Sequence, residues 1–253
     1  MADLFHFNKL DQQPNLVHGV ATAEFGNMSF NWGDYQTVRD NRKRFFDALQ
    51  VDEPRVTVAS LVHGATVSEV TAAEWGWGIV NPEESLEADI LVTAQPDTFL
   101  FMVVADCLAL FLFEPDKQVC ALVHAGWRGV EARAPEVAIR YLIEKHGCRP
   151  ERILAGMSPA IQAKSFSFPT ENVEQNNLPN WAPYLKVVGN ETQIDFTGYA
   201  YQQLLDSGLN SENIERSTVD TKTDPRFFSH RRSVEQQLPE ARFGCLIGFK
   251  NSG

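Results

Sequence analysis

The sequence contains few cysteines and lacks the pattern of a disulfide-stabilised secreted protein. Its 253 residues include four cysteines, which are scattered and form no Cys-x-x-Cys pair. The start of the chain shows no basic region followed by an apolar stretch and a cleavage site, as a secretory signal would. We therefore expect reduced thiols, no disulfide framework and a cytoplasmic protein.

Positive charge and long apolar runs are also scarce. Lys and Arg number 22 against 33 Asp and Glu, which gives a formal net charge of −11. Such a chain lacks the basic face that a nucleic-acid backbone requires. No run approaches the ~18 apolar residues of a membrane span. We therefore expect neither nucleic acid nor a membrane as a partner, whereas small anionic ligands can still bind through local arginines.

The chain does contain enough apolar residues for one large core. Hydrophobic residues make up 43% of it, and no repeat or low-complexity tract divides it. Helices are predicted over 34–49, 131–146 and 196–209, and strands over 55–62, 88–93, 99–105, 152–155 and 244–249. The polar segment 171–189 is predicted to be irregular. Because the strands do not alternate regularly with the helices, we expect an α+β fold with mixed β-sheets and flanking helices, in a single compact domain over residues 1–253.

Two histidines and one cysteine stand where apolar, strand-like runs end. His63 lies in LVHGATV, Cys107 in VVADCLAL and His124 in LVHAGWRGV. Rigid sheets present ligand-binding side chains at such positions. Imidazole nitrogen and thiolate sulfur suit zinc, and three protein ligands leave a fourth position for water or substrate, as in catalytic sites. The trio is therefore predicted to bind a metal and to be catalytic, although His63 or Cys107 alone fits a turn or core residue equally well.

The turn at residues 114–117 predicts how two of these ligands meet. Proline and aspartate at its centre suit a two-residue turn between apolar strands. If Glu114 pairs with Lys117, the register places Cys107 opposite His124, with their Cβ atoms about 5 Å apart. A longer loop or a bulge is the alternative, and a slip of one residue would turn one ligand to the far face.

Neighbouring polar residues are candidates for the remaining roles. Asp106 is predicted to orient a histidine and, as the carboxylate nearest to Cys107 in the sequence, to be catalytic, or else to cap a turn. Arg128 in HAGWRG, and Arg42 in a basic helical segment, are candidates for a phosphate clamp. FFSHRR offers an anion site that contains Ser229 and Arg231. Each segment also has a purely structural alternative. HAGWRG fits a packed turn, the segment of Arg42 fits a solvated helix face, and FFSHRR fits a basic surface turn.

Together these segments resemble the YfiH/laccase-domain family, also described as multicopper polyphenol oxidase, peptidoglycan editing factor (PgeF) or FAMIN-like. The match runs in order through NMSFNWGDYQTVRDNRKRF, LVHGATV, ADILVTAQPDTFLFMVVADCLALFLFEP, VHAGWRG, SPAIQAKSFSF and FFSHRR. The resemblance implies a YfiH/CNF1-like fold and a purine nucleoside phosphorylase that uses adenosine, inosine or guanosine with phosphate. It further implies adenosine deaminase as a side activity, and zinc at His63, Cys107 and His124.

Two departures from the family pattern concern the substrate. Residues 162–167 read QAKSFS where relatives often carry a GPCCYE-like stretch. Val219 and Asp220 stand where relatives often carry a Cys-Thr pair. The preferred nucleoside is therefore open, whereas the metal trio is intact.

Other functions fit the same residues. A Cys-His hydrolase would use Cys107 as nucleophile and His124 as base on a peptidoglycan precursor. A copper-dependent polyphenol oxidase needs an imidazole-rich cluster, whereas the chain has six histidines and no His-x-His pair. A metal-stabilised interaction domain is disfavoured because three ligands with an open position suit catalysis better. The oligomeric state is not predicted.

Overall fold

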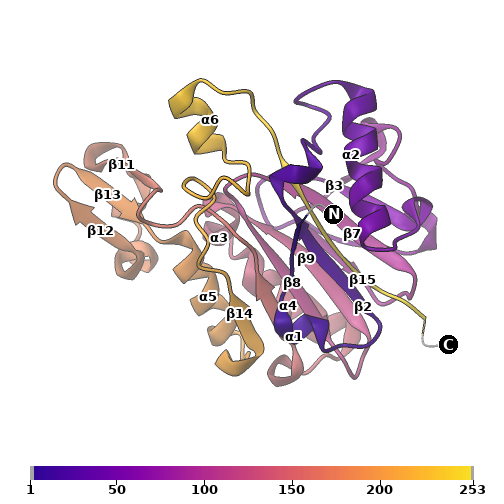
Figure 1. Cartoon of the computed structure of the whole chain (residues 1–253). Helices are drawn as coiled ribbons and strands as arrows, with labels where there is room; N and C mark the ends of the chain where they lie inside the picture. Colours follow the sequence, from indigo (N-terminus) through magenta and orange to yellow (C-terminus); the bar gives the residue numbers. More distant parts are fainter. Residues whose placement is uncertain (1–2, 252–253) are drawn as a thin grey trace.

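The computed structural model describes residues 3–251, which form two six-stranded sheets, one three-stranded sheet and flanking helices (Figure 1). In spatial order, the first sheet contains β1 (Leu4–Phe5), β2 (Leu16–Ala21), β15 (Phe243–Phe249), β7 (Thr98–Val104), β3 (Val56–Ser60) and β5 (Leu86–Glu87). The second contains β14 (Ile214–Arg216), β10 (Leu154–Met157), β8 (Leu108–Glu114), β9 (Val119–Ala125), β6 (Ile90–Thr93) and β4 (Val67–Glu69). Both sheets combine parallel and antiparallel pairs, which confirms the predicted mixed sheets.

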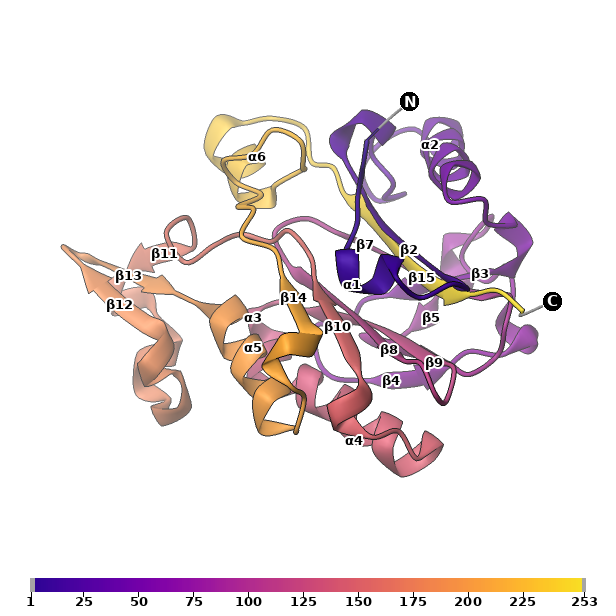
Figure 2. The same cartoon turned by 60° about the horizontal axis from the view of Figure 1, so that its bottom comes forward.

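The second sheet is central because both of its faces are apolar. Every residue of β8 is buried, and alternate side chains point to opposite faces. Phe111 and Phe113 join the core shared with the first sheet, whereas Leu110 and Leu112 pack into the core that includes α4 (Ala134–His146) and α5 (Phe196–Asp206). Figure 2 shows these helices on the side away from β2 and β15. The two cores therefore share one sheet, as expected for a single compact domain.

Local signals place the longer helices close to their predicted ranges, although α4 begins three residues later than predicted because residues 127–131 form the separate helix α3. Asp34 caps α2 (Tyr35–Ala48), whose Phe46 packs edge-on against Phe101 with ring centroids 5.2 Å apart. In α4, Pro135 lies in the first turn and Gly147 ends the helix with a left-handed φ of 63°. The shorter helices are α1 (Asn8–Asp11), α3 (Trp127–Glu131) and α6 (His230–Gln236). No helix among residues 3–251 is long and apolar enough to cross a membrane.

The hairpin formed by β8 and β9 corrects the predicted register. Its loop has four residues rather than two, and Gln118 within it adopts a left-handed φ of 52°. His124 therefore lies opposite Ala109 and not opposite Cys107. The prediction was wrong because it assumed a two-residue type I turn, whose twist does not suit the flanking strands. Since the shift is an even number of residues, His124 keeps its predicted face.

The segment 171–189 is not wholly irregular. Short 3-10 turns are followed by β12 (Leu185–Val188), which pairs with β13 (Glu191–Ile194) and through it with β11 (Ser167–Pro169). This three-stranded sheet projects from one end of the molecule (Figure 1). The prediction failed because β12 leaves Val187 and Val188 exposed and its neighbours are polar, so the sequence shows no buried face.

The buried imidazole of His18 is expected to make the fold sensitive to acid. Its side chain in β2 is 1% exposed, and its Nε2 accepts a hydrogen bond from the N–H of Phe7. Burial and the nearby His6 lower the pKa of His18 from 6.5 to about 3. Below its ordinary pKa the unfolded chain therefore binds a proton that the folded chain excludes, so the free energy of unfolding falls as the pH falls from 6.5 toward 3.

Urea unfolding in EDTA measures this effect. Between pH 7 and about pH 4.5 we expect His18 to account for a loss on the order of 2 kcal/mol in the free energy of unfolding. His18→Gln keeps an acceptor for the N–H of Phe7 but cannot titrate, so its stability should depend less on pH. The same pH dependence in both proteins would show that His18 is not the cause.

Candidate functional site

A cavity of about 920 Å³ lies where the chain passes from the first six-stranded sheet to the second. Three segments make this passage, residues 61–66, 88–89 and 105–107, which we call the seam. They carry His63, Asp89 and Cys107, and His124 lies near the end of β9. The fold therefore gathers the predicted trio from separate parts of the sequence, and adds an aspartate.

Asp89 is the functional residue that sequence reasoning missed. Its Oδ1 lies 3.0 Å from Nδ1 of His124, and both side chains are buried. The same carboxylate accepts hydrogen bonds from the N–H of His63 at 2.9 Å and of Gly64 at 2.7 Å. Asp89 thus fixes the ring of His124 and also the loop in which His63 adopts a φ of 61°. The available signal was a lone acidic residue in the apolar run ADILVT.

Cys107 and His63 both lie beside the ring of His124. Cys107 is close enough to His124 to raise the pKa of its imidazole, and the rings of His63 and His124 are nearly perpendicular, with centroids 5.0 Å apart. A Cβ atom added to Gly126 would lie 2.9 Å from Sγ of Cys107 and 3.6 Å from Nε2 of His124. Glycine at position 126 therefore keeps open the space beside both donor atoms.

The donor set fits zinc, although one side chain must move to complete it. Within residues 3–251, the donor atoms of three such side chains all lie within 4.8 Å of one another only at His6, Asp11 and His18. The trio therefore needs a side-chain rotation before one ion can contact all three donors, and the exposed His63 is the one with room to rotate. Two imidazoles, one sulfur and a carboxylate behind one imidazole are the components of a catalytic zinc site.

The ionisable groups at the trio shift one another's pKa values. Burial alone would lower the pKa of His124, but Cys107 and Asp89 outweigh it and raise this pKa to about 9. Burial would raise the pKa of Asp89, yet the hydrogen bonds from His124 and from the backbone of residues 63 and 64 lower it. Desolvation, together with the neighbouring His124, lowers the pKa of His63. The buried carboxylate of Asp89 is thus ionised at neutral pH, and these hydrogen bonds stabilise its negative charge.

Asp106 does not hold a histidine, which corrects its predicted role. It lies in the third segment of the seam with a φ of 73°. One carboxylate oxygen accepts the hydroxyl of Thr221 at 2.6 Å, and the other accepts the N–H of Arg231 at 2.7 Å. Asp106 therefore ties the start of α6 to the seam, and the orienting role belongs to Asp89. Asp106 also lines the cavity, so its catalytic role stays a prediction.

Arg42 lies inside the protein rather than on a solvated helix face. Its side chain lines the cavity, and its Nε and Nη1 donate to the carbonyls of Met28 and Gly78 at 2.8 and 3.0 Å. Burial, and repulsion from Arg39, lower the pKa of Arg42 to about 9, so it is still charged at neutral pH. A fixed, buried cation therefore faces the same space as the trio.

Two further arginines line the cavity as predicted candidates. The exposed Arg128 lies on α3, with its guanidinium 4.2 Å from the ring centroid of Trp127. Arg231 on α6 donates from Nη1 to the carbonyl of Ser167 at 3.1 Å and lies 4.4 Å from the ring centroid of Phe168. The structure thus brings three predicted substrate-binding arginines to the trio.

Ser229 does not join them. It is buried, and its hydroxyl accepts the N–H of Arg232 at 3.1 Å, which makes it the N-cap of α6. FFSHRR is therefore the start of a helix, and the serine serves the backbone there. Of the predicted anion-binding residues Ser229 and Arg231, only Arg231 lines the cavity.

Aromatic side chains form much of the apolar wall. They are Phe30, Trp32, Trp127, Phe166, Phe168 and Phe196. Phe166 and Phe168 meet edge to face with centroids 5.1 Å apart. Flat aromatic faces beside guanidinium groups match a ligand that is planar at one end and anionic at the other.

Comparison with known proteins links this geometry to a family. Residues 17–249 match the family model described as "Multi-copper polyphenol oxidoreductase laccase". The chain is 30% identical over 220 residues to "Purine nucleoside phosphorylase YlmD" of Bacillus subtilis (strain 168), covering 84% of this chain and 77% of the relative. It is 31% identical over 199 residues to "Purine nucleoside phosphorylase SCO2081" of Streptomyces coelicolor, covering 79% and 78%.

Solved structures show the same fold. The hypothetical protein YfiH of Bacillus licheniformis superposes with a TM-score of 0.90 at 24% identity, covering 99% of this chain and 97% of that one. YlmD of Geobacillus stearothermophilus gives a TM-score of 0.86 at 24% identity, covering 94% and 93%. These likenesses confirm the expected YfiH-like architecture. Since the family model also spans most of the sequence, the chain belongs to the multi-copper polyphenol oxidoreductase laccase family, the YfiH/laccase-domain family that its motifs resemble.

Proposed function

We propose that the protein is a zinc-dependent purine nucleoside phosphorylase that converts adenosine, inosine or guanosine and phosphate into the base and ribose 1-phosphate, with adenosine deamination as a side activity. The observation that carries this proposal is one cavity lined by a metal-binding donor set, by four arginines (the three predicted ones and Arg242) and by an aromatic wall. Relatives named purine nucleoside phosphorylase support the reaction class.

We assign phosphate binding to the arginines of the cavity. The chain is acidic overall, so an anionic co-substrate needs local cations, and Arg42, Arg128 and Arg231 supply them in the cavity. Arg42 is held by two backbone carbonyls and therefore needs little reorganisation when an anion binds. Held in this way, a phosphate oxygen can attack C1′ of the ribose as the bond from C1′ to the base breaks.

Departure of the base leaves an electron pair on it that must be neutralised. Phe166 and Phe168 offer faces for stacking, and of the two carboxylates that line the cavity, Asp106 and Glu235, we assign proton exchange to Asp106, which lies next to Cys107 in the chain. Each oxygen of Asp106 accepts one hydrogen bond and retains a second lone pair. A zinc ion bound by His63, Cys107 and His124 would supply Lewis-acid polarisation of a substrate oxygen or of water.

A second candidate function has its own support. Cys107 lies beside His124, the pKa of His124 is raised, and Asp89 hydrogen-bonds to the other ring nitrogen of His124. This Cys-His-Asp arrangement is what a cysteine nucleophile requires, so a hydrolase acting on a peptidoglycan precursor is the alternative. Copper is the alternative metal, and a polyphenol oxidase is less favoured because multicopper clusters need more imidazoles.

Chromatography of the products formed from adenosine and phosphate tests the proposal. We expect adenine and ribose 1-phosphate in equal amounts, a smaller yield of inosine, and no adenine without phosphate. Purification without chelator should give protein that contains zinc. Failure to release the base from adenosine, inosine and guanosine, with iodoacetamide-sensitive hydrolysis that persists in EDTA, would replace this proposal by the hydrolase.

A further inference from the structure

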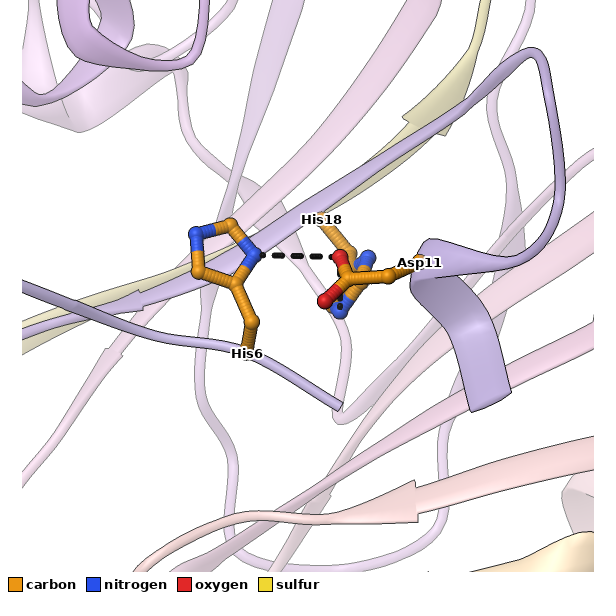
Figure 3. Close-up of side chains that lie close together, drawn as sticks. All are labelled: His6, Asp11 and His18. Atoms are coloured by element: carbon orange, nitrogen blue, oxygen red, sulfur yellow. Dashed lines mark ion pairs between the residues drawn. The ribbon is translucent and has the colours of Figure 1, made fainter. Parts of the chain in front are cut away.

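A second group of metal-ligating side chains lies where the N-terminal segment meets β2 (Figure 3). His6 precedes α1, Asp11 is its last residue and His18 belongs to β2. Oδ1 of Asp11 lies 3.4 Å from Nδ1 of His6 and 3.7 Å from Nε2 of His18. None of the three is among the described residues that line the cavity. This cluster is therefore separate from the candidate active site.

We propose that His6, Asp11 and His18 form a second metal site, which binds a divalent cation of the zinc class. Both contacts of Asp11 exceed the ~2.9 Å of an N–H···O hydrogen bond. They come close to the edge of a tetrahedron of zinc ligands, about 3.3 Å for metal–ligand bonds of about 2.0 Å. The imidazole rings are nearly perpendicular, with centroids 5.2 Å apart, and Figure 3 shows both beside the carboxylate.

Burial divides the three ligands into one fixed and two adaptable groups. The side chain of His18 is 1% exposed, whereas those of His6 and Asp11 are 36% and 50% exposed. The exposed pair gives an ion access from solvent and can adjust to its preferred geometry.

One hydrogen bond competes with the metal. The N–H of Phe7 donates to Nε2 of His18 at 3.0 Å, so an ion at this atom has to displace that donor. Three protein ligands also leave at least one coordination position to water. We therefore expect weaker binding than at a closed structural zinc site. Because the ligands span only residues 6–18, binding closes a short loop and ties α1 to the first sheet at a small entropic cost.

Cobalt binding distinguishes this site from the one at Cys107. Co²⁺ replaces Zn²⁺ in such sites, and only a thiolate ligand adds a sulfur-to-cobalt charge-transfer band. After removal of metals with EDTA, the wild-type protein should bind two Co²⁺ ions per chain in equilibrium dialysis and show this band. His6→Ala and Asp11→Asn, both at exposed positions, should each bind one ion and keep the band. Cys107→Ala should bind one ion without it.

His146→Ala is the matched control, because Nε2 of His146 lies 3.5 Å from Oε1 of Glu69 in a pair to which the described residues add no third ligand. It should bind as many ions as the wild type. The proposal is overturned if His6→Ala binds as much cobalt as the wild type, or if Cys107→Ala binds none. If the wild type binds one ion without the band and His6→Ala binds none, the second site stands and the metal part of the proposed function fails.

Discussion

Replacing Cys107 by alanine is expected to lower kcat/KM for phosphorolysis by about 1000-fold or more, because a bound metal contributes several kcal/mol to the transition state. Sγ of Cys107 lies in the space that Gly126 keeps open beside Nε2 of His124, so its loss removes one of three donors. Cys107 is only partly buried, in a segment of the seam, and the fold should persist. Product formation, zinc content and circular dichroism are the measurements.

Cys148→Ala is the control for this variant. Cys148 is a buried thiol away from the cavity, and burial raises its pKa to about 11. Its truncation should cost about 1 kcal/mol of stability through lost packing and leave zinc and activity in place. Full phosphorolysis by Cys107→Ala would contradict the assignment of the site. Lost activity with unchanged zinc content would favour the cysteine nucleophile.

Asp89→Asn is expected to weaken zinc binding by about 10- to 100-fold, as is typical when the carboxylate behind a histidine ligand is lost. Asp89 accepts from Nδ1 of His124 and from the N–H groups of His63 and Gly64. An amide in its place turns one N–H toward these donors, so a buried donor loses its acceptor at a cost of about 1–3 kcal/mol. Competition with a chromophoric chelator and urea unfolding measure the two effects.

Asp106→Asn provides the comparison, since Asp106 lines the same cavity but accepts from Thr221 and Arg231 rather than from a histidine. Its zinc affinity should equal that of the wild type. Equal losses of zinc affinity in both variants would mean that Asp89 has no special part in holding the metal ligands.

The fold was predictable where local chemistry decides it. The capping aspartate Asp34 and the left-handed Gly147 act within one turn of the helices they delimit, so the sequence is sufficient to place α2 and α4. The register of the hairpin of β8 and β9 depends instead on the length of its loop. That length could not be predicted from the turn-forming residues between the two strands. The three-stranded sheet was missed because its short strands bury little and carry polar side chains.

The candidate site was likewise predictable only in part. His63, Cys107 and His124 could be found because each follows an apolar run, whereas Asp89 acts on partners 26 and 35 residues away that only the seam brings to it. Ser229 was misassigned because its hydroxyl serves a helix cap, a backbone demand that the sequence alone does not separate from ligand binding.

The seam has a further consequence, for the order of events during folding. Either sheet alone carries only part of the candidate site, because His63 and Cys107 lie on segments that join the two sheets, whereas Asp89 and His124 adjoin paired strands of the second sheet. A hairpin of β8 and β9 that forms early holds His124 without its supporting carboxylate. The candidate site is therefore complete only in the fully assembled molecule, and we expect a half-folded chain to be inactive.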